Sequence, residues 1–524
     1  ALGTFDANNQ STINHHTNSA PNPYVSEKKM CWLTMRFSKG RTLLLLLVIV
    51  ATLLSSSRVS ALPRPSLTPR QKTIEIGDIS RRRRVEIRRG GGSSSKSDSP
   101  TGAQEGTSSL SQSTFNLVNN VAGAGILALS AGQAAGTGWV PSMIISIILG
   151  IISARTFVMV GEACEMLQEE DFKGLWAKTF SEKTTFIVDA MIALLCLCMD
   201  VIYSGILGDV STFLLGQTGI PAHLNNRATN IIITTVGLLL PMSLIKDLSV
   251  LSFTSILGFA AVMYTVLLIA YRALDGSYAL GSGKFLADGL ITAMPSFTKQ
   301  SLWNVDFTSL ILISTLSLAY VSHYNAPIFY RQLENTSSRR FGKLTYSSFI
   351  LVTLLYMVTM GAGYSTFGEA CLGNILLNYH PNDMLATFGR VATWFSILFG
   401  FPLVTTGARE SLIGAASSFG YPQVGYDKNN FVLVISILTL ATVVSCTVKD
   451  VSFVVNLTGA LFGTFIVYLC PTMIYVRAVE LAKGKGSKEY KLARWNNVLL
   501  PFGVFIAALG VFITIREQIN KVAA

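Results

Sequence analysis

The chain has 524 residues, of which 50% are hydrophobic and only 13% are charged. Soluble domains carry about 25% charged residues, so this composition excludes an ordinary water-soluble fold and indicates a protein of the lipid bilayer. The net charge of +12 does not indicate a nucleic-acid-binding protein, because most of it lies at one end. Residues 1–113 hold 16 of the 41 Lys and Arg against 7 of the 29 Asp and Glu, a net +9, which leaves +3 for the other 411 residues.

A possible targeting segment lies within this basic tail, at residues 35–61. It has a basic start, an apolar run over Leu43–Leu54 and the small residues Val59-Ser60-Ala61, which is the form of a secretory signal. The apolar run is too short to cross a bilayer core of about 30 Å. A cleaved targeting sequence, a signal anchor and a meaningless extension all stay open. The Ser-, Gly- and Arg-rich remainder of residues 1–113 is predicted to be largely disordered.

Eleven apolar stretches follow, each long enough to span a membrane. They are predicted to be helices, because lipid offers no hydrogen-bond partner to backbone groups and the stretches lack the alternation of barrel strands. Together they form a predicted transmembrane domain over residues 114–518, followed by a short tail, 519–524. The spans are 114–136, 139–161, 184–208, 228–246, 249–271, 305–330, 343–367, 384–408, 430–448, 450–476 and 495–516.

The distribution of basic residues predicts the orientation. With the N-terminal tail in the cytosol, the cytosolic loops hold 16 Lys and Arg and the opposite side holds 8. The positive-inside rule therefore favours a cytosolic N-terminus and an external C-terminus. A cleaved signal peptide would put the tail on the other side.

Two spans contain residues that interrupt a helix. In the first span, Asn119 and Asn120 precede Gly123-Ala124-Gly125, and glycine lowers the cost of leaving helical geometry. In the sixth, Ser322 to Asn325 precede Pro327, which removes a backbone donor. Interrupted helices five spans apart are expected of two inverted five-helix repeats, and they point to a transporter binding site. The alternative is that the glycines only permit close helix packing.

At these residues the chain resembles the amino acid/auxin permease family, which includes sodium-coupled neutral amino acid transporters and vacuolar amino acid transporters. The resemblance covers about residues 111–518. The first helix (FNLVNNVAGAGILALSAGQAAGTGW) and the sixth-helix block (SHYNAPIFYRQLENTSSRRF) carry it, and PMSLIKDLSVLSFTSILG, GYSTFG and the eighth-helix residues Arg390, Pro402 and Arg409 support it. It implies an all-α integral membrane protein with about eleven helices, a leucine-transporter-like fold of two inverted five-helix repeats, and alternating-access transport of amino acids, with neutral amino acids as the expected substrates.

The interrupted helices then predict where a substrate binds. Amide groups of Gly123, Ala124 and Gly125, near a helix N-terminus, would receive the carboxylate. Backbone carbonyls around Ser322 and His323 would take the ammonium group. The hydroxyl of Tyr203, on the third span, would donate toward the carboxylate, although a packing role is at least as compatible with its position.

The coupling ion, Na⁺ or H⁺, is the only cofactor that the resemblance implies. In the sodium-coupled members, an asparagine matching Asn119 and threonines of the eighth helix contribute to the ion site. Leu398 and Gly400 stand at those threonine positions here, and Ser396, one turn before Gly400, is the substitute hydroxyl.

A buried acid offers the proton alternative. Asp200, sixteen residues into the third span, is a candidate proton carrier or a partner of Arg155, because a charge at the bilayer centre costs about +2.5 to +3.5 kcal/mol. No histidine or cysteine pair at ligand spacing indicates a metal site.

Two other classes of function compete with transport. The sequence Gly363-Tyr364-Ser365-Thr366, followed by His380, resembles the surroundings of a serine-hydrolase nucleophile. No set of residues for an oxyanion hole accompanies it, so we expect no enzyme. An amino-acid-sensing receptor on the same fold is the main alternative. The expected partners are an amino acid and the lipid bilayer, in the plasma membrane or in a vacuolar or other internal membrane.

Overall fold

The computed structural model describes residues 106–221, 223–245, 252–286, 291, 293–298, 301–421 and 427–523. Contacts divide the chain into the units Ala1–Thr101 and Gly102–Ala524, and every described residue lies in the second unit. The predicted targeting segment 35–61 and nearly all of the basic tail therefore lie outside the described residues.

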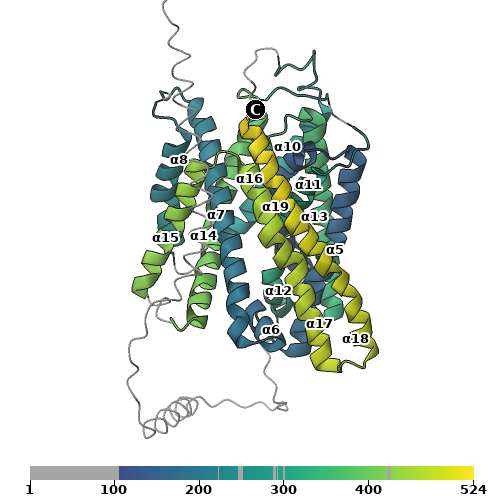
Figure 1. The fold of residues 1–524 in the computed structure, drawn as a ribbon. Helices are drawn as coiled ribbons and strands as arrows, with labels where there is room; N and C mark the ends of the chain where they lie inside the picture. Colours follow the sequence, from purple (N-terminus) through teal and green to yellow (C-terminus); the bar gives the residue numbers. More distant parts are fainter. Residues whose placement is uncertain are drawn as a thin grey trace, which may run out of the picture. The chain divides into compact units, whose positions relative to one another are not determined.

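The described part is helical, with three isolated β-bridges as its only extended pairings. Each predicted span coincides with one helix or with a series of helical segments stacked end to end (Figure 1). The helices are α3 (Leu110–Val121), α4 (Leu129–Ala134), α5 (Trp139–Leu167), α6 (Phe172–Thr179), α7 (Thr185–Gly216), α8 (Arg227–Thr234), α9 (Leu240–Ser243), α10 (Ser252–Leu274), α11 (Ser309–Ala319), α12 (Ala326–Gln332), α13 (Ser338–Phe367), α14 (Met384–Ser418), α15 (Asp427–Thr447), α16 (Val451–Thr458), α17 (Cys470–Lys483), α18 (Lys488–Ala493) and α19 (Leu499–Ala523).

By length and apolar composition, eight helices of the described residues are able to cross a membrane, and nine if the bent pair formed by α3 and Gly125–Ala134 is one span. The two remaining predicted spans are divided among shorter segments. One is α8 and α9, joined by the π-helical turn Thr235–Leu239, and the other is α11 and α12. The prediction of an all-helical membrane protein with interrupted first and sixth spans is confirmed.

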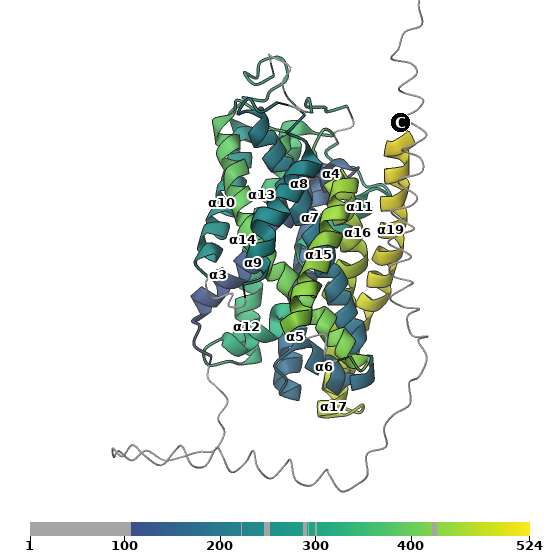
Figure 2. The same ribbon diagram turned by 90° about the vertical axis from the view of Figure 1, so that its left-hand side faces the viewer.

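The ends of the spans define two faces. The N-terminal face carries the start of α3, the short helix α6 and the turn between α17 and α18, and the C-terminal face carries the end of α19 and the loop between α13 and α14. In Figure 2, α3 and α12 lie toward the N-terminal face, and α4 and α11 lie toward the C-terminal face. Each interrupted span thus has one half on either side of its break.

The first break forms at Ala122. Its φ of −77° and ψ of 61° make an inverse γ-turn, in which the Gly123 N–H donates to Val121 O at 2.8 Å. Gly123 is extended, and a 3₁₀ turn over Ala124–Ala128 leads into α4. The two halves are bent by 51°.

The sixth-span break is shorter. α11 ends at Ala319, Ser322 leaves helical geometry with φ −158°, and a 3₁₀ turn over His323–Asn325 starts the second half. Pro327 then occupies the first turn of α12, where its missing N–H costs nothing. The same residue that predicts the break therefore also starts the helix after it.

A short backbone pairing joins the two interrupted spans on the N-terminal face. The Ser108 N–H donates to Gln332 O, and the Glu334 N–H donates to Ser108 O, both at 3.0 Å. Gly106 lies so close to residues 332–334 that a Cβ on it would approach Leu333 O to 2.5 Å, so only glycine fits. We call residues 106–108 and 332–334 the latch, because it ties the entry of α3 to the exit of α12.

Candidate functional site

The two breaks lie against each other in the middle of the helical unit. A Cβ at Gly125 would lie 3.4 Å from Ala319 Cα, which is ordinary van der Waals contact, so the two spans pack directly against each other here. The Asn325 side-chain amide donates to Asn120 Oδ1 at 3.3 Å. We call the residues around the two breaks the central site.

Two backbone amides of the central site stand at the start of a helix. Those of Ala124 and Gly125 lie in the first turn of a 3₁₀ helix, where a helix supplies no acceptor to its own N–H groups. The amide of Gly123, which the sequence also suggests as a donor, already serves Val121 O. The helix start therefore offers two of the three expected donors for a carboxylate.

Tyr203 of α7 faces the same turn. A Cβ placed on Gly123 would lie 3.5 Å from the Tyr203 hydroxyl, and one placed on Gly400 of α14 would lie 3.9 Å from the ring. Its ring also packs near Phe401, with centroids 6.4 Å apart. Tyr203 thus lies between the first-span break and α14.

The second break contributes backbone rather than side chains. Ser322 O accepts from the Asn325 N–H at 2.9 Å, and His323 O accepts from the Ala326 N–H, so each keeps one lone pair for a further donor. The His323 ring turns away, toward α5, where Nε2 lies 3.0 Å from both Thr156 Oγ1 and Ser153 O. Its ring packs edge-on against Phe157. The structure thus places the His323 side chain outside the central site.

One side chain connects both breaks. The hydroxyl of Tyr356, a fully buried residue of α13, lies 2.9 Å from Val121 O and 2.6 Å from Ala319 O. These are carbonyls at the C-terminal ends of α3 and α11, where a helix leaves acceptors unsatisfied. Since a hydroxyl has one proton, Tyr356 shares it between the two breaks.

Two of the predicted ion-coupling residues, Asn119 and Ser396, lie on helices that contact neighbouring residues of α10. Ser396 Oγ lies 3.2 Å from the position of a Cβ on Gly258 of α10. The next residue, Phe259, packs against Phe115 of α3 with centroids 4.6 Å apart, and Asn119 lies one turn after Phe115. Ser396 and Asn119 are therefore on two helices that both contact α10.

Asp200 lies in a different place, between α7 and α14. It is fully buried, and its Oδ1 accepts from the Thr405 hydroxyl at 3.1 Å. Its Oδ2 has no hydrogen-bond partner within the described part of the chain. The pair with Arg155 that the sequence leaves open does not form, because Arg155 instead binds Glu162 at 3.1 Å on its own helix.

The residues of the hydrolase alternative are engaged in structural contacts. Ser365 Oγ accepts from the Trp139 indole at 3.3 Å. His380 stacks on Phe285 and its Nδ1 accepts from the Asn382 N–H at 3.0 Å. These contacts hold the α13–α14 loop in place.

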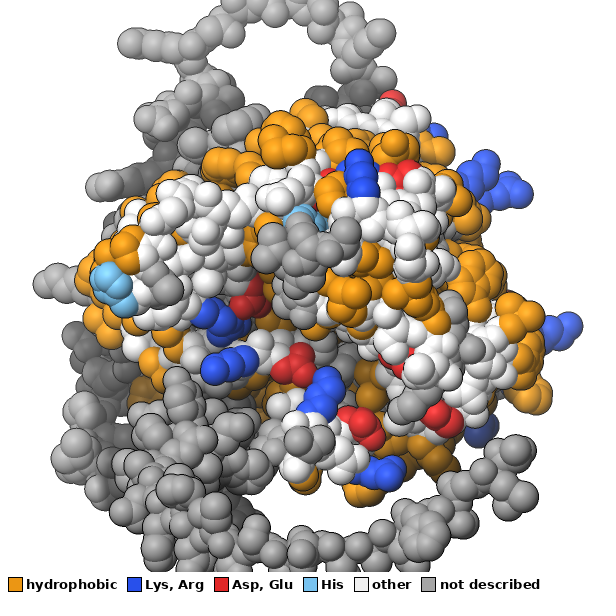
Figure 3. Space-filling view, turned by 90° about the horizontal axis from the view of Figure 1, so that it is seen from above, with side chains coloured by type: hydrophobic (Ala, Val, Ile, Leu, Met, Phe, Trp, Pro, Cys, Tyr) orange, Lys and Arg blue, Asp and Glu red, His pale blue; other side chains and the backbone are white. Residues whose placement is uncertain are grey.

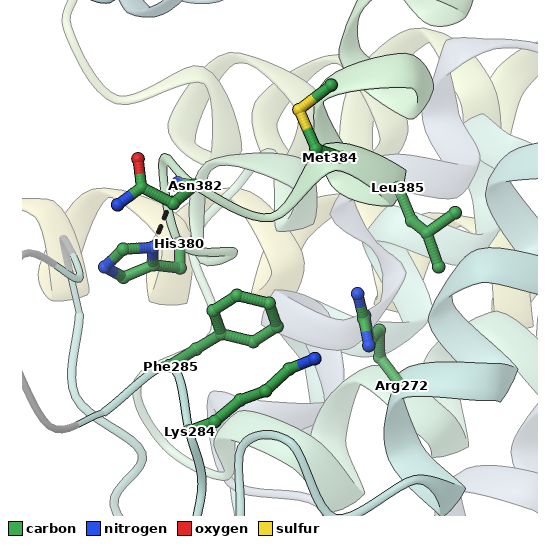
Figure 4. A pocket seen from close by; sticks show the side chains of 7 residues that line it. All are labelled: Arg272, Lys284, Phe285, His380, Asn382, Met384 and Leu385. Atoms are coloured by element: carbon green, nitrogen blue, oxygen red, sulfur yellow. Dashed lines mark hydrogen bonds between the residues drawn. The ribbon is translucent and has the colours of Figure 1, made fainter.

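A cavity of about 430 Å³ lies beside that loop on the C-terminal face. In Figure 4, Arg272 and Lys284 approach the Phe285 ring, and His380 lies on the ring's other side. Next to this cavity, the buried carboxylate of Asp383 accepts from Arg272 at 2.6 Å and from the Tyr278 hydroxyl at 2.9 Å. The cluster joins the end of α10 to the start of α14, so we assign it a structural role.

With the fold and the central site in place, the comparisons with known proteins define the class. Residues 106–516 match the transmembrane amino acid transporter protein family, and the chain belongs to this family. It is therefore a multi-pass membrane transporter of the amino acid/auxin permease group.

Relatives of this chain carry related names. A putative sodium-coupled neutral amino acid transporter 11 from Danio rerio is 25% identical over 78% of this chain and 86% of its own length. Vacuolar amino acid transporter 5 from Schizosaccharomyces pombe is 24% identical over 73% of this chain and 88% of its own length. An inward-facing structure of Mhp1 covers 80% of this chain and 92% of its own, with a TM-score of 0.54 and 13% identity. This last similarity shows the shared fold, in agreement with the predicted leucine-transporter-like architecture.

Sequence reasoning missed Tyr356 and the contact of Asn325 with Asn120 at the central site, and it missed Thr405 beside Asp200. Tyr356 lies in an ordinary apolar helix, and the carbonyls that it binds exist only once the breaks have formed. The one available signal was the burial of a tyrosine hydroxyl, which requires a partner.

Proposed function

We propose that this protein carries neutral amino acids across a membrane by alternating access, coupled to a cation. The observation that carries the proposal is the contact of the two breaks, which bring helix-start amides at Ala124 and Gly125 and carbonyls at Ser322 and His323 into one region. A helix N-terminus favours the carboxylate, and lone pairs of carbonyls favour the ammonium group. Tyr203 adds a hydroxyl donor.

Sodium is the first candidate for the coupling ion. The helices that carry Asn119 and Ser396 both contact α10. A hard cation binds oxygen ligands, and both side chains and the carbonyls of an interrupted helix supply them. The name of the Danio rerio relative supports the same ion.

A proton is the second candidate, and Asp200 favours it. An ionised carboxylate with one unpartnered oxygen is costly in a buried position. A buried carboxyl group is stable when it holds a proton. Asp200 lies one turn before Tyr203, so its protonation would couple to substrate binding at Tyr203.

Uptake into proteoliposomes separates these possibilities. Twenty radiolabelled amino acids are offered to the purified full chain under an inward sodium gradient and, separately, under an inward proton gradient. We expect accumulation of small and medium neutral amino acids under one gradient only. Absence of uptake under both would contradict the transport proposal and would leave the sensing receptor as the remaining alternative.

Two variants assign the ion site. Asn119→Ala is expected to lower sodium-dependent uptake while leaving expression intact, and Asp200→Asn is expected to abolish a proton-driven component. If neither variant changes the ion dependence, both residues are removed from the coupling site.

We also propose that the N-terminal face is cytosolic, as the 16 against 8 basic residues of the loops favour. The acceptor pattern Asn335-Thr336-Ser337 provides the test, because it lies on this face beside the latch. A glycan on Asn335 in eukaryotic cells would reverse the orientation.

A further inference from the structure

A second cavity, of about 520 Å³, opens on the C-terminal face of the molecule. Figure 3 looks onto this face, where acidic and basic side chains gather among hydrophobic ones. The cavity lies between α4, the α13–α14 loop, the start of α16 and the end of α19. Its walls include Asn374, Lys449, Asp450, Thr514, Glu517 and Lys521.

Two buried polar atoms in its walls have no partner. Asn374 is 2% exposed and Thr514 is 3% exposed, yet Asn374 Nδ2 and Thr514 Oγ1 have no hydrogen bond within the described residues. The opposite end of the Asn374 amide is fixed, because its Oδ1 accepts from the Leu376 N–H at 3.1 Å. A buried donor without a partner costs about 1–3 kcal/mol, so its presence in a cavity wall indicates a ligand that supplies an acceptor.

The charges of the walls divide into satisfied and unsatisfied groups. Asp450 pairs with Lys521 at 3.1 Å, and Asp209 pairs with Arg227. Glu517 and Lys449 form no ion pair with any other described residue. Glu369, also in the wall, accepts from the Thr298 hydroxyl at 2.8 Å. Among the described residues of the wall, Glu517 and Lys449 thus supply one unpaired carboxylate and one unpaired ammonium group, the complement of a zwitterion.

We propose that this cavity is a second amino-acid-binding site, which holds the zwitterion on the C-terminal face before it reaches the central site. Glu517 receives the α-ammonium group, while Lys449 and the Asn374 amide receive the carboxylate. Thr514 lies one turn before Glu517 on α19 and hydrogen-bonds the same ligand. A volume of this size is ordinary for a small-molecule site. The inference rests on the proposed transport function and adds to it a second site that is separate from the two breaks.

Substitutions of nearly equal shape test the site. Glu517→Gln removes the charge, Thr514→Val removes the hydroxyl, and Asn374→Asp keeps the Oδ1 that caps Leu376 while removing the donor. The matched control is Thr472→Val, because Thr472 of α17 is also fully buried with an unpartnered hydroxyl but lines neither described cavity. Thr514→Val is not expected to lower the thermal stability of the ligand-free protein, since it removes a buried group that has no partner.

The first measurement is uptake in proteoliposomes, with the amino acid that wild type carries fastest. Each of the three variants is expected to raise KM about two- to tenfold, the effect of about one hydrogen bond, with little change in kcat. Thr472→Val is expected to match wild type. Unchanged KM in all three variants, or an equal change in Thr472→Val, would overturn the second site.

The second measurement counts the ligands directly. Equilibrium binding of the same radiolabelled amino acid to the purified chain in nanodiscs should give two equivalents for wild type and one for the double variant Glu517→Gln with Thr514→Val. One equivalent in wild type, with transport intact, contradicts this inference alone. Absence of wild-type uptake contradicts the transport function itself, so the two failures are distinguishable.

Discussion

The two breaks occupy equivalent places in spans one and six, yet they are held in different ways. The first takes its shape from a γ-turn at Ala122 and an extended Gly123, and it shares with the second break the bonds made by Tyr356 and Asn325. The second is also anchored to α5 by its own side chains. The His323 ring hydrogen-bonds there with Ser153 O, and the Tyr320 hydroxyl donates to Ser146 O at 3.1 Å. The first break is therefore the one with fewer side-chain restraints on its geometry.

This difference assigns different tasks to the two breaks. A segment with fewer buried side-chain hydrogen bonds has a lower free energy for local rearrangement than a segment with several of them. We expect the first-span break to change conformation when substrate binds and the sixth-span break to remain the fixed reference. The following predictions test that division.

The largest effect is expected where the breaks touch. Gly125→Leu would place a side chain against Ala319, 3.4 Å from where its Cβ begins. Interior contacts of this kind do not absorb extra atoms, so uptake should fall below detection. Gly237→Leu is the control, because a Cβ there meets no atom within 4 Å. Normal uptake by the Gly125 variant would mean that the breaks do not stay in contact during transport.

Tyr356→Phe should have the next largest effect. It removes the donor that Ala319 O uses, whereas Val121 O keeps the Gly123 N–H. An unsatisfied buried acceptor such as Ala319 O costs about 1–3 kcal/mol. Denaturation in detergent micelles should show this loss. Tyr379→Phe is the control, because the equally buried Tyr379 hydroxyl has no partner among the described residues. If both variants unfold alike, Tyr356 does not support the breaks.

Gly106→Leu tests the latch. The side chain would collide with Leu333 O and break two backbone hydrogen bonds, each with a net value of about 0.5–1.5 kcal/mol. Protection of the Ser108 and Glu334 amides from hydrogen exchange should be lost, while that of α5 stays. Unchanged protection at both amides would show that the pairing does not persist in solution.

The smallest effect is expected from the bond between Asn120 and Asn325. In a double-mutant cycle with alanine at each position, the coupling energy should be about 0.5–1 kcal/mol, because the bond is partly exposed and 3.3 Å long. Initial uptake rates measure it. A coupling energy of zero would remove this bond from the set of contacts that hold the breaks together.

The sequence predicted the spans, because long apolar stretches in lipid have helices as their main solution. It also predicted both breaks, since Gly123, Gly125 and Pro327 alter the backbone wherever they occur. It did not predict that His323 turns toward α5 or that Arg155 binds Glu162. Such choices depend on which helix faces lie opposite each other, and that is a property of the packed helices.

The helix ends were also less predictable than the spans. α5 continues to Leu167 and α14 to Ser418, beyond the apolar stretches that ended at residues 161 and 408. Hydropathy marks the apolar part of a span, whereas a helix ends where its backbone finds another partner. The first helix likewise begins at Leu110, where the Ser109 hydroxyl caps it.

The latch has a mechanical meaning. Two half-helices that are free to tilt separately have two independent motions, but backbone bonds between Ser108 and residues 332 and 334 reduce these to one. While these bonds hold, a tilt of α3 would have to be accompanied by a tilt of α12. Because residues 106–108 are the last stretch before α3, a pull on the chain ahead of Gly106 is transmitted to both halves at once.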